Sequence, residues 1–524
     1  MTHLQAPITA PASGGDHRAA QASGRAGPRA WAGLALLSLP TIMLGMDLTL
    51  LHLTLPALAR DLQATTTQAL WIMDAYGFLI AGFLITMGTL GDRIGRRRLL
   101  LLGAGAFALA SVLAACATSA GMLIAARAAL GIAGATLMPS TLALISNLFV
   151  DPRERALGIG IWVTMWGIGY ALGPVVGGLL TEAFWWGAAF LVAVPVVLLL
   201  LVLAPWLLPE YRAPRAERLD LLSVGLSLAA ILPVIYGIKQ LAKAGPAPLA
   251  IAAIGIGLLF ALLFVRRQRR LADPLLDLSL FANRAFSVAL VVLLVGLIAV
   301  GGAMLLVAQY LQLIAGHSPA AAGLWMGLAA LAMIAGGLGS SLLARLVRPG
   351  FVVAGSLALS ALGYLLFMRL GSGDASGVSA AIAGLALAYL GNGAIAALGT
   401  DLVVGAAPPE KAGSASAMTE MVQDLGVSLG IALLGSLAGA VYQHRLSDHL
   451  PDGLDEGLRS AVLDSLWAAQ SVAPELPAGL LEQARQAFVA GFGGAALLSA
   501  ASVALLALLS SVTLRQVGRD AKTA

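Results

Sequence analysis

Four carboxyl side chains stand out within the long apolar runs of this chain. Asp47 occurs in GMDLTLLHLTLP, Asp74 in LWIMDAYGF, and both Glu420 and Asp424 in SAMTEMVQDLG. An ionisable group costs at least ~2.5 kcal/mol in a membrane-spanning helix, so it is a functional candidate wherever such a run crosses a bilayer. A carboxyl group kept from water can be neutralised by a proton or by a cationic ligand. The four acids therefore predict a site where protons and cations compete.

Each acid also has a structural interpretation, as a hydrogen-bonding group or as an ion-pair partner of Arg127 in LIAARAALGIAGA. The i, i+4 spacing of Glu420 and Asp424 places both on one helical face. Arg127 is predicted to be the only basic residue within an apolar run. Either a structural ion pair or the tuning of proton release would explain it, and the sequence leaves both roles open.

The run WVTMWGIGYALGPVVGGLL carries a second pattern. Gly169, Gly173 and Gly177 recur every four residues, so one helical face forms a groove that allows a close helix neighbour. Pro174 leaves a backbone carbonyl without its helical donor and favours a bend. A neighbouring aromatic stripe either packs or attracts a cation through its ring faces. It comprises Trp162, Trp166 and Tyr170.

Charge is concentrated in GTLGDRIGRRRL, residues 88–99, where the seven residues from Asp92 to Arg98 hold five charges. A short loop at the membrane surface needs only its arginines to set the orientation of the chain. Gly88, Asp92 and Gly95 at fixed offsets therefore indicate a further role for this loop.

The overall composition predicts an all-α polytopic membrane protein. The 524 residues are 59% hydrophobic and 11% charged, and the mean hydropathy is +0.91. Soluble domains, by contrast, are about a quarter charged. An apolar run of ~20 residues crosses a bilayer as a helix. Fourteen such runs are present: 31–54, 69–91, 98–117, 121–146, 156–180, 184–208, 220–240, 247–265, 286–313, 321–345, 351–369, 376–402, 414–442 and 486–514.

The basic residues predict an orientation with both ends of the chain in the cytosol. Of the 31 Lys and Arg residues, 23 then lie in cytosolic segments, as the positive-inside rule requires. Seven are expected in the outer loops: Arg60, Lys239, Lys243, Arg369, Arg445, Arg459 and Arg485. The pI near 9.5 therefore requires no nucleic-acid partner.

The sequence offers little support for a disulfide, a metal site, an enzyme or an ATP-driven pump. Cys116 is the single cysteine, which predicts a small buried packing residue and no internal disulfide. His52 and His317 have no metal-ligand partner in sequence, so both are interpreted as structural and no metal site is predicted. The sequence has no GxxxxGK[ST] phosphate-binding loop and no nucleophile–base constellation, which argues against an ATP-driven pump and an enzyme. Channel filter motifs are missing as well.

The motifs together resemble one family. Gly88-x-Leu90-x-Asp92-Arg93-x-Gly95-Arg96-Arg97 resembles the signature loop between spans two and three of the major facilitator superfamily. Arg127 with Gly131 and Gly134 resembles its fourth-span motif, and Gly169-xxx-Gly173-Pro174-xx-Gly177-Gly178 is similar to the fifth-span motif of its drug:proton antiporters. MDLTLLHLTLP resembles the first-span motif of the fourteen-span branch, so the chain is most similar to QacA-type exporters.

This resemblance implies a major facilitator fold, in which two six-helix bundles flank a cavity and two extra helices are inserted between them. The expected segments are a disordered basic tail (1–30), the first bundle (31–208), the inserted pair with its linkers (209–271), the second bundle (272–514) and a cytosolic tail (515–524). The long outer loop 443–485 carries Leu458, Val462, Leu466 and Trp467 near one helical face. This pattern predicts an amphipathic helix, as either a cap or a passive linker.

The resemblance further implies a monomeric multidrug efflux antiporter of the bacterial inner membrane. It would export lipophilic cations (quaternary ammonium compounds, dyes, biguanides) by alternating access, driven by protons and without a cofactor. Asp47, Asp74 and Glu420 match positions where such exporters place acids for protonation or drug recognition. The charged loop would latch the bundles through Asp92, Arg93 and Arg96, with Gly88 and Gly95 permitting a tight turn. Met333 replaces an acid of relatives that favour divalent drugs, which favours monovalent cargo.

Two alternatives remain. The same fold could export an amino acid, a siderophore or a lipid, although an anionic cargo would need an unpaired cation. A channel or a membrane sensor is the other class of protein that this composition allows.

Overall fold

The computed structural model describes residues 26–212, 220–244, 248–271, 274–344, 346–371, 373–408, 412–447, 450–451 and 453–513. Within these residues, fourteen helices are long and apolar enough to cross a membrane, as the sequence predicts. Both predicted tails lie outside the described residues, except for residues 26–30 of the first.

The first six spans are formed by α2 (Pro28–Asp61), α3 (Thr66–Ile94), α4 (Arg96–Ala115), α5 (Ala120–Leu148), α6 (Pro152–Ala183), and the pair α7 (Ala188–Leu191) and α8 (Ala193–Leu207). Side chains cap the starts of these helices. Thr65 and Gln68 form a reciprocal capping box at α3, and Asp151 accepts two backbone hydrogen bonds at α6. Such caps pair the free N–H groups of a first helical turn, so they fix where these spans begin.

The remaining spans are α9 (Leu221–Ala244) and α10 (Pro248–Gln268), then α11 (Arg284–Gln309) with its π-helical end η2 (Tyr310–Ile314), α12 (Pro319–Leu343), α13 (Pro349–Leu366), α14 (Ala375–Gly405), α15 (Ala412–Ser447) and α18 (Leu480–Thr513). Short helices stand between them: η1 (Leu278–Ala282), η3 (Phe367–Arg369), α16 (Glu456–Asp464), α17 (Leu466–Ser471) and η5 (Ala473–Glu475).

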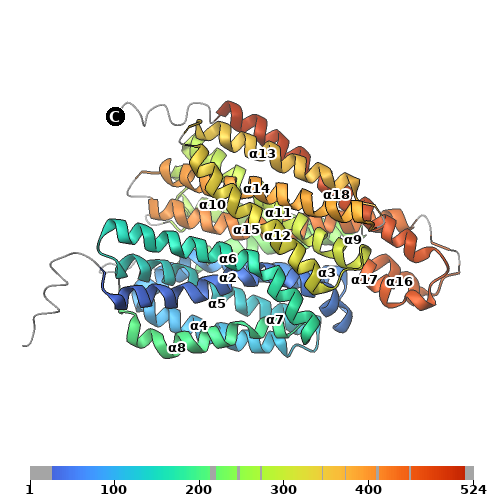
Figure 1. Cartoon of the computed structure of the whole chain (residues 1–524), viewed down its shortest axis with the longest axis horizontal. Coiled ribbons are helices and arrows are strands. Elements are labelled where there is room, and N and C mark those ends of the chain that lie inside the picture. Colours follow the sequence, from blue (N-terminus) through green and yellow to red (C-terminus); the bar gives the residue numbers. More distant parts are fainter. Residues whose placement is uncertain are drawn as a thin grey trace, which may run out of the picture.

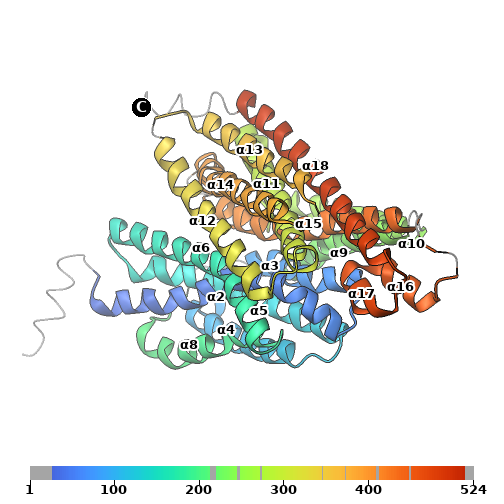
Figure 2. The same ribbon diagram turned by 45° about the vertical axis from the view of Figure 1, so that its right-hand side comes forward.

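The helices form two bundles that lie side by side in both views (Figures 1 and 2). The first bundle consists of α2–α8, in which α2 packs along α6 and α5 packs between α3 and α4. The second bundle consists of α11–α15 and α18, in which α14 packs between α12 and α13. The inserted hairpin, α9 and α10, packs through α9 against α3 of one bundle and α15 of the other.

The two bundles touch most closely at one end of the molecule. At this end α6 finishes and α12 begins, and a side-chain carbon added to Gly178 or Gly323 would overlap the backbone carbonyl of Pro319 or Pro174 across the interface. The backbone N–H of Ala320 also donates to Glu182 Oε2 of α6 at 3.1 Å. We call this the α16–α17 end, because those two helices lie there (Figure 2).

The long loop packs as a cap over the α16–α17 end. Val462, Leu466 and Trp467 are buried, at 0%, 2% and 5% exposure. The backbone N–H of Thr66 in α3 donates to Asp464 Oδ2 at 3.0 Å, and the Tyr442 hydroxyl of α15 donates to the Val462 carbonyl at 2.7 Å. The loop therefore contacts both bundles, which favours the cap over the passive linker. Its described part forms two short α-helices and one 3-10 turn rather than a single helix.

Cys116 differs from its prediction. The residue follows α4 at the C-cap position, and its side chain is exposed. The apolar run 98–117 extends past the end of the helix at Ala115, so this cysteine does not pack inside the bundle.

Candidate transport site

Asp47 and Arg127 form a buried ion pair between α2 and α5. Arg127 Nη1 lies 2.7 Å from Asp47 Oδ2, and the two side chains are 2% and 7% exposed. Arg127 Nε donates to the Ile72 carbonyl of α3 at 3.1 Å, and the guanidinium lies 4.3 Å from the ring centroid of Tyr76. Removing either charge would leave the other buried without its partner.

A glycine makes this arrangement possible. Gly131 lies one turn after Arg127 on α5, and a side-chain carbon there would approach the Tyr76 carbonyl of α3 to 2.5 Å. The bare backbone lets α3 and α5 approach closely enough for Arg127 to reach the Tyr76 ring. The fourth-span motif therefore positions the arginine as well as supplying it.

Asp74 forms a second buried ion pair, with a partner that the sequence did not predict. Lys239 Nζ of α9 lies 2.7 Å from Asp74 Oδ2, and both side chains are 0% exposed. The ammonium also lies 4.1 Å from the ring centroid of Trp71. The prediction that Lys239 belongs to an outer loop is wrong, because α9 continues through it to Ala244. Arg127 is consequently not the only basic residue within a span.

Glu420 and Asp424 lie one turn apart on α15, on the same helical face. Asp424 is 5% exposed, and its Oδ2 atom is buried without a hydrogen-bond partner. The Asp424 carbonyl lies beside Gly77 of α3, so the residue faces the helix that carries Asp74. Among the described residues, no Lys, Arg or His pairs with either acid. Of the four acids, two hold a resident cation, and the other two have none in the part of the chain that the structure describes.

The α6 glycines lie against α2. A side-chain carbon added at Gly169, Gly173 or Gly177 would overlap the backbone of α2. The ring of Pro174 removes the N–H that would bond the carbonyl four residues earlier, and that carbonyl, of Tyr170, instead accepts a hydrogen bond from Thr49 Oγ1 at 2.9 Å. Gly178 faces the second bundle at α12. The motif therefore places α6 between α2 and α12.

The aromatic stripe on α6 divides into two environments. Trp162 packs against α5, where its Nε1 donates to Thr141 Oγ1 at 3.1 Å. Trp166 stacks on Tyr170 with 5.6 Å between ring centroids. Tyr170 also meets Tyr389 of α14 edge to face at 6.4 Å, so it reaches the second bundle. Trp166 and Tyr170 thus lie where the bundles face each other, whereas Trp162 is engaged within the first.

The charged loop turns sharply at Gly95, whose φ of 113° is a conformation that favours glycine. Asp92 Oδ1 and Arg96 Nη2 pair at 2.7 Å. Gly88 lies inside α3, where a side-chain carbon would make only an ordinary contact with Pro139 at 3.8 Å, so the expectation that the turn requires glycine there is wrong.

The other contacts of this loop fall within the first bundle and the segment that follows it. The backbone N–H of Arg96 donates to the Tyr211 carbonyl at 2.9 Å, and that of Arg97 donates to Glu210 Oε1 at 3.0 Å. Arg93 is exposed. A latch between the bundles through Asp92, Arg93 and Arg96 remains a prediction for another state of the cycle.

Comparison with known proteins identifies the family. Residues 37–431 match the family model of the Major Facilitator Superfamily. The chain belongs to the major facilitator superfamily. Its fourteen spans fit the drug:proton antiporter branch. The family, the spans and bacterial relatives support a multi-pass protein of the inner membrane, and a transporter rather than an enzyme.

Two relatives align over nearly the whole chain. The multidrug efflux pump LfrA of Mycolicibacterium smegmatis is 40% identical over 93% of this chain and 97% of its own length. The methyl viologen resistance protein SmvA of Salmonella typhimurium is 36% identical over 91% and 97%. In three dimensions, a bacterial homologue of the human lysosomal transporter Spinster, in an inward-facing and unoccupied conformation, matches with a TM-score of 0.65 at 17% identity, covering 94% of this chain and 99% of its own. This last likeness concerns the fold alone.

Proposed function

We propose that this transporter exports lipophilic cations in exchange for protons. The observation that carries the proposal is the pair of acids Glu420 and Asp424, which have no basic partner among the described residues and lie on α15, the helix of the second bundle that packs against α3 of the first. A cation from the cytosol could bind there only when the acid is ionised, and a proton would displace it. The similarity to a multidrug efflux pump, LfrA, and to a methyl viologen resistance protein, SmvA, supports a drug-like cargo.

The same geometry supports alternating access as the mechanism. The bundles meet at the α16–α17 end, where α12 contacts α6 and the cap contacts α3. We place the cytosol at the opposite end, so this structure represents a state closed to the outside. Rocking the bundles would open the α16–α17 end, admit a proton and release the cation. A one-for-one exchange of monovalent charges moves no net charge across the membrane.

The principal alternative keeps the fold and changes the cargo. An anionic amino acid or siderophore would require a free cation in the site, and the two buried cations that the structure describes, Arg127 and Lys239, both hold carboxylates at 2.7 Å. This pairing favours a cationic cargo.

The test uses inverted membrane vesicles that contain a pH-sensitive dye and are energised to an acidic interior. Addition of ethidium should release protons from vesicles that carry the wild-type protein, and Glu420→Gln with Asp424→Asn should abolish the release. Glu482→Gln is the matched control, because Glu482 lies at the exposed start of α18 beside Arg485. A pH signal that ethidium does not change in the wild type would overturn the proposal.

Methyl viologen serves as the dicationic comparison in the same assay. Met333 occupies the place in α12 where an acid would hold a second charge, so we expect a weaker proton release with methyl viologen than with ethidium. An equal response would contradict the preference for monovalent cargo while leaving the exchange itself intact.

A further inference from the structure

The inserted hairpin is tied to the first bundle by the ion pair between Lys239 and Asp74. We propose that Lys239 is a positioning residue of the transport cycle: it occupies Asp74 as a tethered cation, and a proton arriving from the α16–α17 end takes its place and frees α9 from α3. This inference rests on the proposed function, since it requires that protons drive transport. The inference gives the inserted helices α9 and α10 a role in coupling proton binding to the movement of the bundles.

The pair is held by charge rather than by well-formed hydrogen bonds. Lys239 Nζ lies 2.7 Å from Asp74 Oδ2, but neither that nitrogen nor either Asp74 oxygen has a partner with hydrogen-bond geometry among the described residues. A proton can therefore bind the carboxylate without first breaking a hydrogen bond to it. The Trp71 ring, 4.1 Å from Nζ, stabilises the lysine as a cation.

Other charged groups face this carboxylate from neighbouring helices. Arg127 of α5 reaches α3 at the Ile72 carbonyl, but its guanidinium is already paired with Asp47. Asp424 of α15 faces α3 beside Gly77. Lys239 is the only one of these groups in direct contact with Asp74, so it is the group a proton must replace.

A small pocket lies between the start of α3 and the lysine. Lys239, Thr66, Thr67, Ser436 and Gln443 line it, together with the apolar residues Leu70, Gly439 and Ala440. Thr66 is the first residue of α3 and also bonds the cap at Asp464. When the cap moves away, water at this end can reach the ion pair, whereas cytosolic water cannot reach it through this pocket.

The position of α9 between the two bundles links protonation of Asp74 to helix movement. Phe78 of α3, Ile235 of α9 and Ala432 of α15 form a small buried apolar cluster, at 0%, 1% and 0% exposure. Since α3 and α15 belong to different bundles, they must separate when this end opens, and α9 can follow only one of them. With the ion pair intact, α9 stays with α3; once Asp74 is protonated, α9 is free to stay with α15.

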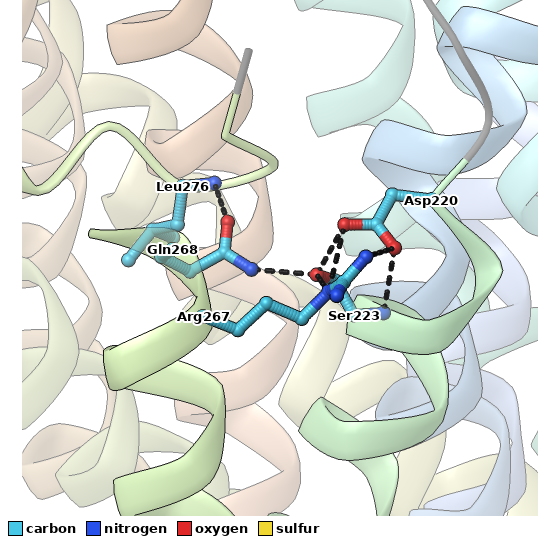
Figure 3. Close-up of polar contacts among 5 residues, drawn as sticks. All are labelled: Asp220, Ser223, Arg267, Gln268 and Leu276. Carbon is cyan, nitrogen blue, oxygen red and sulfur yellow. Dashed lines mark hydrogen bonds and ion pairs between the residues drawn. The ribbon is translucent and has the colours of Figure 1, made fainter. Parts of the chain in front are cut away.

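The hairpin moves as one body because its other end is clamped (Figure 3). Asp220 accepts a hydrogen bond from Arg267 Nη2 at 2.9 Å, and Ser223 accepts one from Gln268 Nε2 at 2.7 Å. Burial acts to raise the pKa of Asp220, but the hydrogen bonds from Arg267 and Ser223 outweigh it and lower that pKa below 3.8. The clamp therefore keeps its charges near neutral pH, and only the Lys239 end responds to the proton.

The charges balance over one cycle. Asp74 carboxylate and Lys239 ammonium are together neutral. Uptake of one proton gives the neutral carboxylic acid and an ammonium that turns into the small pocket. Loss of that proton toward the cytosol restores the ion pair, so this pair carries one proton in each round, in addition to the proton exchanged for the cargo at Glu420 and Asp424.

The test compares Lys239→Met, Lys239→Arg and the double variant Asp74→Asn with Lys239→Met. In inverted vesicles, ethidium-evoked proton release is measured against pH, and thermal stability is measured on the purified proteins. We expect Lys239→Met to shift the pH profile toward higher pH by about one unit or more, because Asp74 then takes its proton without displacing a cation. Lys239→Arg should keep the wild-type profile.

The double variant separates coupling from structure. It removes both buried charges, so its melting temperature should return to that of the wild type. Its proton release should be at least about tenfold lower than that of the wild type, because no carboxylate remains at position 74 to take the proton. Recovery of both stability and proton release in the double variant, or an unshifted pH profile in Lys239→Met, would overturn the inference. A wild-type protein without ethidium-evoked release would instead refute the proposed function, which separates the two failures.

Discussion

The ion pair between Arg127 and Asp47 permits a quantitative test of how the site is held together. Asp47→Asn preserves the shape of the side chain but leaves the guanidinium, 2% exposed, without its carboxylate at 2.7 Å. Breaking a buried pair by removing one partner costs about 3–5 kcal/mol. The Ile72 carbonyl and the Tyr76 ring remain as partners of the cation, so we expect a loss near the lower limit, about 3 kcal/mol.

Unfolding of the purified protein in mixed micelles measures this loss for Asp47→Asn, Arg127→Met and the double variant. Removal of both charges should recover most of the stability, because no uncompensated charge then remains buried. If Asp47→Asn costs less than about 1 kcal/mol, the value typical of exposed pairs, the two groups are not coupled as the structure shows. A double variant that loses the sum of both single losses would contradict the pairing as well.

Three further predictions concern the helix contacts, the cap and the clamp. Gly173→Leu should prevent α6 from packing on α2 and abolish folding or transport, whereas Gly167→Leu, which has open space, should be tolerated; equal behaviour in transport assays would contradict the groove. Asp464→Ala should speed amide hydrogen exchange in the first turn of α3, which this side chain bonds at 3.0 Å; unchanged exchange would show that the cap does not restrain α3. Arg267→Gln should cost about 1 kcal/mol or less, because the pair is partly exposed. Because the pKa of Asp220 is lowered from 3.8, that cost should be constant above about pH 5 and disappear as the pH falls through the folded-state pKa; a cost that persists at the lowest pH would refute the assignment.

The sequence predicted best those features that depend on a continuous pattern of residues, such as a membrane-spanning helix. The fourteen apolar runs correspond to fourteen helices, because a bilayer demands both length and apolarity from each span. Caps such as Thr65 and Asp151 explain the starts of α3 and α6. The spacing of the α6 glycines also predicted the close neighbour that α2 provides.

Contacts between residues far apart in the sequence could not be predicted from these local patterns. Lys239 was assigned to a loop although it lies within the apolar run 220–240, because its partner Asp74 is on a helix distant in sequence. One available signal was missed: a lysine inside a predicted span requires a carboxylate, as the arginine at 127 does. The predicted single helix of the cap is interrupted at Ser465, whose side chain caps the start of α17. The spacing of apolar residues alone does not show where one short helix ends and the next begins.

The central claim is that a proton and a cationic drug compete for the same buried acids. The most direct measurement adds ethidium to the purified protein in weakly buffered solution and follows the pH with an indicator dye while binding is recorded. The account predicts that about one proton is released for each ethidium bound at a pH where the acids hold protons, and that Glu420→Gln with Asp424→Asn loses this release. Tight ethidium binding without any proton release, in the wild type and at every pH tested, would contradict it.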